Sequence, residues 1–119
     1  MENPSATLTV FSNCLVATLP QEAGIPVLEE LRGSMLEALE SANRRAVIFD
    51  LTGVQLLESS EFAHLSESGR MAELLGARAC IVGLRPAVVA YLVSIEAEFQ
   101  HFLIARSLQM ALDQIEALQ

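Results

Sequence analysis

The sequence predicts one α/β domain in which about four helices pack on a four- to five-stranded mixed sheet. Two observations lead to this prediction. Short apolar runs alternate along the chain with stretches in which apolar residues recur at helical spacing. The 119 residues, 52% of them apolar, are enough for one hydrophobic core but not for two packed domains. We therefore treat residues 1–119 as a single domain.

The first third of the chain predicts a β-hairpin followed by an amphipathic helix. Apolar residues lie on both sides of Ser12 and Asn13, a pattern typical of two strands joined by a short polar turn. From residue 27 to about residue 42, apolar side chains follow one helical face while charged side chains occupy the other. The side chains expected to face inward are Leu28, Leu31, Met35, Leu36 and Leu39.

Two short and almost wholly apolar runs, residues 46–49 and 79–82, predict strands that are buried on both faces of a parallel sheet. Between them, a second helix is expected to begin at Ser59 or Ser60 and to run to Leu75, where Gly76 ends it. Read from the residues alone, the two serines cap this helix. Its inward side chains are predicted to be Phe62, Leu65, Ala72 and Leu75.

The last third predicts two further helices and a short strand. Pro86 suits the first turn of a helix over residues 86–93, because no amide proton is needed there. Residues 102–104 predict a short edge strand. Ser107 is a plausible N-cap for a final helix. The inward side chains of that helix are predicted to be Leu108, Ala111, Leu112 and Ile115.

Composition excludes several classes of partner. Seven basic residues, all arginine, are outnumbered by fifteen acidic ones, which gives a formal charge of −8. A chain of this charge lacks the basic surface that nucleic acids and anionic membranes require. Aromatic residues make up only 5% and tryptophan is absent, which disfavours a stacking platform for bases or sugars. We therefore expect the partner to be another protein.

The N-terminal segment and the cysteines indicate a cytoplasmic protein without a cofactor. Residues 3–21 carry no charge, but polar residues recur throughout them, so a membrane span is not predicted. Glu2 stands where a secretory signal needs a cationic segment. Cys14 and Cys80 lie in apolar runs without CxxC spacing, so we expect buried reduced thiols and no metal or redox site.

The most informative segment is residues 47–65, which combine a buried strand, a loop and two serines at a helix start. The loop reads Asp-Leu-Thr-Gly-Val at residues 50–54, and the helix start reads Glu-Ser-Ser at residues 58–60. These motifs resemble the signature of STAS domains, the anti-sigma-factor antagonist family. Leu-Gly-Ala at residues 75–77 and Gly-Leu-Arg-Pro at residues 83–86 resemble the stressosome branch of that family. The resemblance extends from about residue 7 to residue 118.

The resemblance implies a single STAS domain of the RsbS type, related to the C-terminal domain of RsbR-type proteins. Such a domain is a non-enzymatic scaffold that holds a switch kinase of the RsbT type and releases it on phosphorylation. It joins RsbR-type STAS proteins in a homo-oligomer or a large hetero-assembly. The alternative is a STAS subunit or simple anti-sigma-factor antagonist that serves another system, such as a lipid or anion transporter.

The resemblance also assigns site residues. The phosphoacceptor of the family corresponds to Ser59, with Ser60 and Thr52 as alternatives. Two departures place carboxylates beside Ser59: Glu58 stands where the family has aspartate, and Glu61 where simple antagonists often have glycine. Like-charge repulsion from these carboxylates would oppose an added phosphate. The exposed partner-binding surface is predicted to comprise Glu58, Ser59, Ser60, Glu61, Phe62, Gly53 and Arg85.

No catalytic residues are predicted. Residues 57–61 supply neither glycine of the GxSxG nucleophile elbow, which disfavours a serine hydrolase. His64 and His101 show no ligand spacing with cysteines or carboxylates, so no metal centre is expected. The glycines are isolated and form no phosphate-binding loop.

Overall fold

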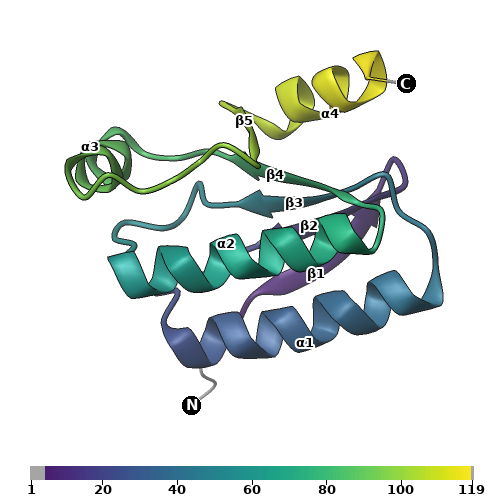
Figure 1. The fold of residues 1–119 in the computed structure, drawn as a ribbon, viewed down its shortest axis with the longest axis horizontal. Helices are drawn as coiled ribbons and strands as arrows, with labels where there is room; N and C mark the ends of the chain where they lie inside the picture. Colours follow the sequence, from purple (N-terminus) through teal and green to yellow (C-terminus); the bar gives the residue numbers. More distant parts are fainter. Residues whose placement is uncertain (1–4, 119) are drawn as a thin grey trace.

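Five strands form one sheet in the order in which they occur along the chain (Figure 1). A computed structural model of the protein describes residues 5–118. β1 (Thr7–Phe11) pairs antiparallel with β2 (Cys14–Thr18). From β2 onward, β3 (Ala46–Asp50), β4 (Arg78–Val82) and β5 (Leu103–Ala105) pair in parallel. The predicted hairpin and the predicted mixed sheet are both confirmed.

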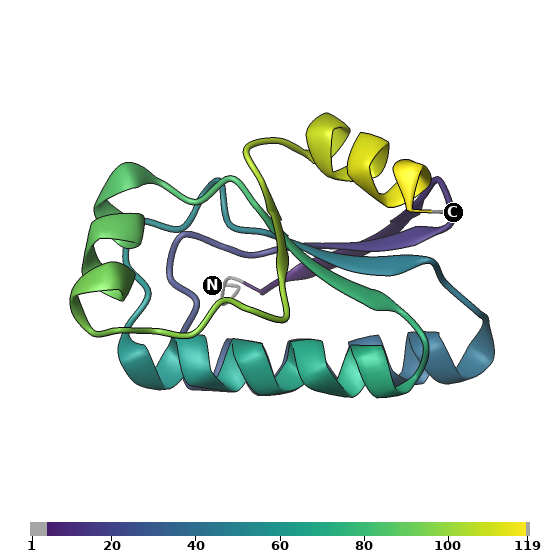
Figure 2. The same ribbon diagram turned by 45° about the horizontal axis from the view of Figure 1, so that its top comes forward.

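Four helices surround this sheet, as predicted. α1 (Ile25–Ser41) and α2 (Ser59–Leu74) lie side by side on one face, and α4 (Leu108–Ala117) lies on the other (Figures 1 and 2). α3 (Pro86–Ser94) sits beyond the end of the sheet at which β3 and β4 finish (Figure 2). The chain is therefore a single α/β domain with three layers.

Alternation along the strands divides the core into two apolar layers. In β3, Val47 and Phe49 pack toward α1 and α2, whereas Ile48 packs toward α4. Successive side chains of a strand point to opposite faces, which explains why the run is apolar throughout. Cys14 and Cys80 lie buried and reduced in the layer beneath α4, as predicted.

The ends of the helices differ from the predictions in two places. α1 begins two residues earlier than expected, with Pro26 in its first turn. Leu75 is 51% exposed and does not face inward, because α2 ends at Leu74 and the chain reverses at Gly76, which has a φ of +90°. The amide of Ala77 then donates to the carbonyl of Ala72 at 3.0 Å, as in a Schellman turn.

The predicted cap of α4 is confirmed. The hydroxyl oxygen of Ser107 accepts a hydrogen bond from the amide of Met110 at 3.2 Å.

Within residues 5–118, none of the helices has the length and apolar character needed to cross a bilayer.

Candidate functional site

The predicted site residues gather at the edge of the sheet where the parallel strands end. Thr52 and Gly53 follow β3, Ser59 begins α2, and Arg85 is the N-cap residue of α3. In parallel α/β sheets the carboxyl ends of strands and the amino ends of the following helices share one edge. The topology therefore brings the loop after β3, the start of α2 and the loop after β4 to one edge of the molecule (Figure 2).

The loop after β3 is shaped by Asp50. Its carboxylate oxygen Oδ1 accepts hydrogen bonds from the amide of Thr52 at 2.9 Å and from the hydroxyl of Thr52 at 2.6 Å. The amide of Val54 donates to the carbonyl of Leu51 at 3.0 Å and closes the turn. The hydroxyl of Thr52 is thus committed to holding the loop.

The loop after β4 fits closely against this turn. Gly83 has a φ of +75°, and a Cβ atom there would lie 3.0 Å from the backbone of Thr52. Only glycine meets both demands without strain. Arg85 then donates from Nε to the carbonyl oxygen of Thr52 at 3.0 Å. These contacts hold the loops after β3 and β4 together.

The start of α2 corrects the expectation that the serines cap the helix. Glu58 is the N-cap residue, and Ser59 and Ser60 are the first two helical residues. The carboxylate of Glu61 accepts a hydrogen bond from the amide of Glu58 at 2.9 Å, which is one half of a capping box. Glu58 and Glu61 form the capping box of α2. The side chains of Ser59 and Ser60 are exposed and do not cap the helix.

Ser59 borders a hollow of about 360 Å³ that sequence reasoning missed. α2 forms one wall of it, and the segment after α3 forms the other. No single segment carries a signal for it, because its walls are far apart in the sequence. The lining residues are Ser59, Phe62, Ala63, Ser66, Glu67, Arg70, Ile95, Ala97 and Glu98.

Phe62 belongs to the core beneath this hollow. Its side chain is 4% exposed and its ring packs on Phe99 and Phe102, with centroids 5.0 and 6.2 Å away. The inward placement is confirmed, whereas the prediction that Phe62 lies on the exposed surface is wrong. The apolar ring gains more from burial than a surface position would allow.

Positive charge is scarce around Ser59. Arg85 lines a separate hollow together with Thr52 and Gly83. Arg70 lines the same hollow as Ser59, but eleven residues of helix separate them, which is about 17 Å along the axis. The arginine nominated from the sequence therefore braces a loop, and the one that shares the hollow lies three turns away.

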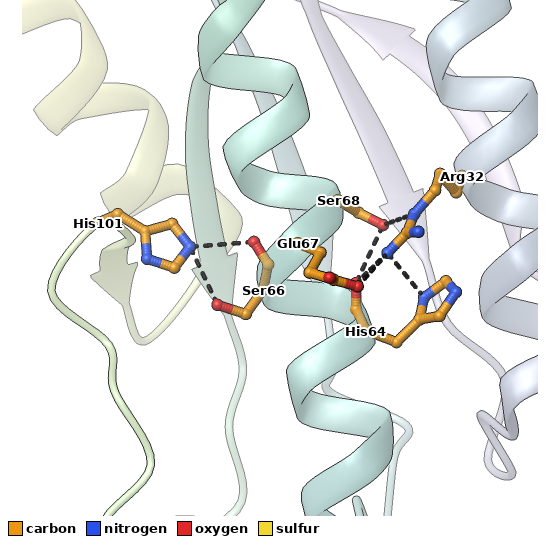
Figure 3. A network of polar contacts seen from close by, with 6 residues as sticks. All are labelled: Arg32, His64, Ser66, Glu67, Ser68 and His101. Atoms are coloured by element: carbon orange, nitrogen blue, oxygen red, sulfur yellow. Dashed lines mark hydrogen bonds and ion pairs between the residues drawn. The ribbon is translucent and has the colours of Figure 1, made fainter.

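A network of polar contacts fixes α2 from both sides (Figure 3). From α1, Arg32 donates to the hydroxyl of Ser68 at 2.8 Å and to the carbonyl of His64 at 2.7 Å. From the segment before β5, Nε2 of His101 lies 3.2 Å from the carbonyl oxygen of Ser66. Polar contacts thus tie α2 to the segments on both of its sides, while its first turn remains exposed.

The histidines of this network lie on opposite sides of α2 (Figure 3). The ring of His101 stacks on Phe102 with centroids 4.3 Å apart. Within residues 5–118, no three histidine, cysteine, aspartate or glutamate side chains are grouped so that they could hold a metal ion.

Comparison with known proteins gives one match in sequence. No family model matches the chain. It is 24% identical over 106 residues to the RsbT co-antagonist protein RsbRA of Bacillus subtilis. The match covers 86% of this chain but only 37% of RsbRA, so the chain spans little more than a third of that relative.

Solved structures match in fold. A serine-to-glutamate variant of RsbS from Moorella thermoacetica superimposes with a TM-score of 0.82 and 19% identity, covering 95% of this chain and 96% of that chain. A chain from the stressosome, described as a signal integration and transduction hub, gives 0.81 and 20%, with 94% and 97% covered. An anti-sigma-factor antagonist (STAS) domain protein from Planctomyces limnophilus gives 0.76 and 20%, with 96% and 99% covered. The chain thus has the fold of a STAS domain, and in sequence it is similar to the RsbT co-antagonist protein RsbRA.

Proposed function

We propose that this chain is a phospho-switched protein-interaction module of the RsbS type. It holds a switch kinase of the RsbT type at the edge that carries Ser59 and releases the kinase when Ser59 is phosphorylated. The chain is a substrate and scaffold, not an enzyme. The observation that carries this proposal is an exposed serine at the first position of α2, whose hydroxyl is not used to cap the helix.

Ser59 suits phosphorylation better than the two alternatives. The hydroxyl of Thr52 already donates to Asp50 and supports the loop after β3. Ser60 is exposed, but it lies one residue further along the helix and therefore points about 100° away from Ser59. Of these three residues, Ser59 is the one that lines the hollow beside Phe62 and Ile95. A partner seated in that hollow would contact Ser59 directly.

The electrostatics of the helix start predict that phosphorylation weakens a contact and does not build one. A phosphate adds a charge of about −1.5 to −2 at neutral pH, and the amino end of α2 offsets only part of it. Glu58 and Glu61 flank Ser59, while Arg70 is about 17 Å away along the helix. The modified surface becomes a dense acidic cluster that repels an acidic partner.

The comparisons support the proposed assembly with other STAS proteins. Similarity to RsbRA and to RsbS supports assembly with RsbR-type STAS proteins in a large complex. We place this complex in the cytoplasm, which agrees with reduced buried cysteines at positions 14 and 80.

Binding measurements with charge variants test the switch. The ligand is a purified switch kinase of the RsbT type, and the variants are Ser59→Asp, Ser59→Ala and Ser34→Asp. Ser34 is exposed on α1 and serves as a charge-matched control. We expect Ser59→Asp to weaken kinase binding at least about tenfold, which is about 1.4 kcal/mol. The other two variants should bind like the unmodified protein.

Calorimetry provides the affinities, and circular dichroism checks that each variant is folded. Ser59→Asp is expected to fold normally, because Ser59 is exposed and an acidic residue in the first turn favours a helix. A folded Ser59→Asp protein that binds the kinase as tightly as Ser59→Ala would exclude the proposed switch.

A further inference from the structure

A second cavity lies at the opposite edge of the sheet from Ser59. β3 and β4 begin at this edge, and α2 and α4 end there (Figure 1). Its volume is about 370 Å³. The residues that line it are Arg45, Glu73, Gly76, Ala77, Arg78, Ile115 and Leu118.

Arg45 is held in this cavity by its backbone. Its amide donates to the carbonyl of Asn13 at 3.0 Å, and its carbonyl accepts from the amide of Arg78 at 3.0 Å. The backbone of Arg45 is hydrogen-bonded, but its side chain is not fully so. Its Nε and Nη2 atoms are buried and have no hydrogen-bond partner within residues 5–118. Unpaired buried donors are costly, and those of a charged group most of all.

The two unpaired nitrogens share one edge of the planar guanidinium group. Their N–H bonds are parallel, and this fork is the edge that binds a carboxylate or phosphate side-on through two hydrogen bonds. Arg45 lines the open cavity, but these two nitrogens are themselves buried, so an oxyanion reaches them only if the side chain turns toward the cavity. This edge of the guanidinium group therefore matches a carboxylate or phosphate in chemistry.

The charged residues at this edge also favour an anionic ligand. Arg78 also lines the cavity, and Arg44 is the next residue to Arg45. Within residues 5–118 the structure shows one ion pair, which joins Arg32 to Glu67. Glu73 lines the cavity but is therefore not within ion-pair distance of Arg45 or Arg78. Three of the seven basic residues therefore cluster at one edge of a chain with a formal charge of −8.

We propose that this cavity is an oxyanion-binding site in which Arg45 and Arg78 hold a carboxylate or phosphate group. The group is either a free anion or the side-chain carboxylate of a second copy of this acidic chain. Leu118 lines the cavity and is 54% exposed, which gives the site an apolar rim. The site is independent of the proposed switch, because Ser59 lies at the other edge of the sheet.

Thermal unfolding in sodium phosphate, compared with sodium chloride of equal ionic strength, tests the site. The variants are Arg45→Met and Arg106→Met, which remove the same charge. Arg106 is exposed and lies outside this cavity. Phosphate should raise the unfolding midpoint of the unmodified protein and of Arg106→Met by about 4 °C or more at saturation, and leave Arg45→Met unchanged. Equal shifts in all three proteins would overturn the proposal.

NMR spectroscopy of the unmodified protein gives a second test, which does not depend on whether a variant folds. The Nε–H signal of Arg45 in a nitrogen–proton correlation spectrum should shift on phosphate addition and saturate. A signal that stays in place up to the concentration that stabilises the protein would also overturn the proposal.

Light scattering then identifies the source of the oxyanion. If a second copy supplies a carboxylate, the mass exceeds the 12.9 kDa of one chain, and both phosphate and Arg45→Met return it to that value. A mass that neither phosphate nor Arg45→Met changes, with the thermal response to phosphate retained, assigns the site to a free anion.

Discussion

The side chain of Ser59 is exposed and does not cap α2, because two neighbouring glutamates form the capping box at the start of this helix. Glu58 takes the N-cap position, and Glu61 accepts the amide proton of Glu58. Serine often fills that role itself, in which case its hydroxyl is engaged. The same two carboxylates make the surroundings of Ser59 acidic, so the residues that free the hydroxyl also determine how a phosphate would act.

Cys80 gives a pH-dependent prediction at the residue scale. Burial, with Cys14 nearby, raises the pKa of the Cys80 thiol from 9.0 to about 12. In the unfolded chain the thiol ionises near its ordinary pKa, whereas the folded protein keeps it protonated. The free energy of unfolding should therefore fall as pH rises from about 9 toward about 12.

Urea unfolding at pH 8 and at pH 10.5 measures this loss. Cys80→Ala serves as the control, because it removes the titrating thiol and should lose less stability over the same interval. An equal pH dependence in both proteins would contradict the assignment.

Single residues also show where sequence reasoning succeeds and fails. Ser107 was predictable as a cap, because it precedes a clear amphipathic pattern. Leu75 was not predictable as exposed, since the pattern of α2 places it on the inward face and only the reversal at Gly76 turns it outward. The glutamate cap at Glu58 was missed because serine is the commoner capping residue.

α2 is the element on which the site depends. Arg32 fixes it to α1, and His101 fixes the segment before β5 to its other side (Figure 3). Its buried face also carries Gly69, which lets α2 approach Phe102. The first turn of α2 can therefore be exposed without loosening the helix.

Two glycine substitutions test this packing. A Cβ atom at Gly69 would lie 2.7 Å from Cε1 of Phe102, so Gly69→Ala should lower the free energy of unfolding by about 1–3 kcal/mol. Gly33 in α1 has no atom within 4 Å of the same position, so Gly33→Ala should raise it by up to about 1 kcal/mol. Urea titration compares both. A Gly69→Ala protein as stable as the unmodified one would refute the close approach.

At the scale of elements, the sequence predicts strands and helices better than their contacts. Both buried parallel strands were recognisable as short apolar runs. The hollow beside Ser59 was not, because it forms where α2 meets residues 95–98, and no spacing within either segment records that contact. Arg70 was missed for the same reason, although it follows Ser59 and Ser66 at helical spacing.

The whole molecule presents two chemically different edges. One edge carries Ser59 and the loops after β3 and β4, and the other carries Arg44 and the cavity that Arg45 and Arg78 line. The composition predicted an acidic protein with a protein partner, but not this division, because folding places residues from distant segments together. The proposed kinase contact and the proposed anion site therefore lie at opposite edges of the sheet.

Assembly provides a prediction at this scale. Mixed with an RsbR-type STAS protein, the chain should enter a particle whose mass far exceeds the sum of one copy of each. Size-exclusion chromatography with light scattering measures that mass, and the chain alone is the control. Separate elution of the two proteins at all ratios would contradict the proposed scaffold role.

The central claim is that Ser59 receives the phosphate that releases the kinase. Mass spectrometry of the intact chain and of its peptides, after incubation with the RsbT-type kinase and ATP, tests it most directly. The account predicts one added phosphate that maps to Ser59 and is absent from Ser59→Ala, together with loss of kinase binding in the modified fraction. A phosphate found on another residue while Ser59 stays unmodified, or a fully phosphorylated Ser59 protein that still holds the kinase, would contradict it.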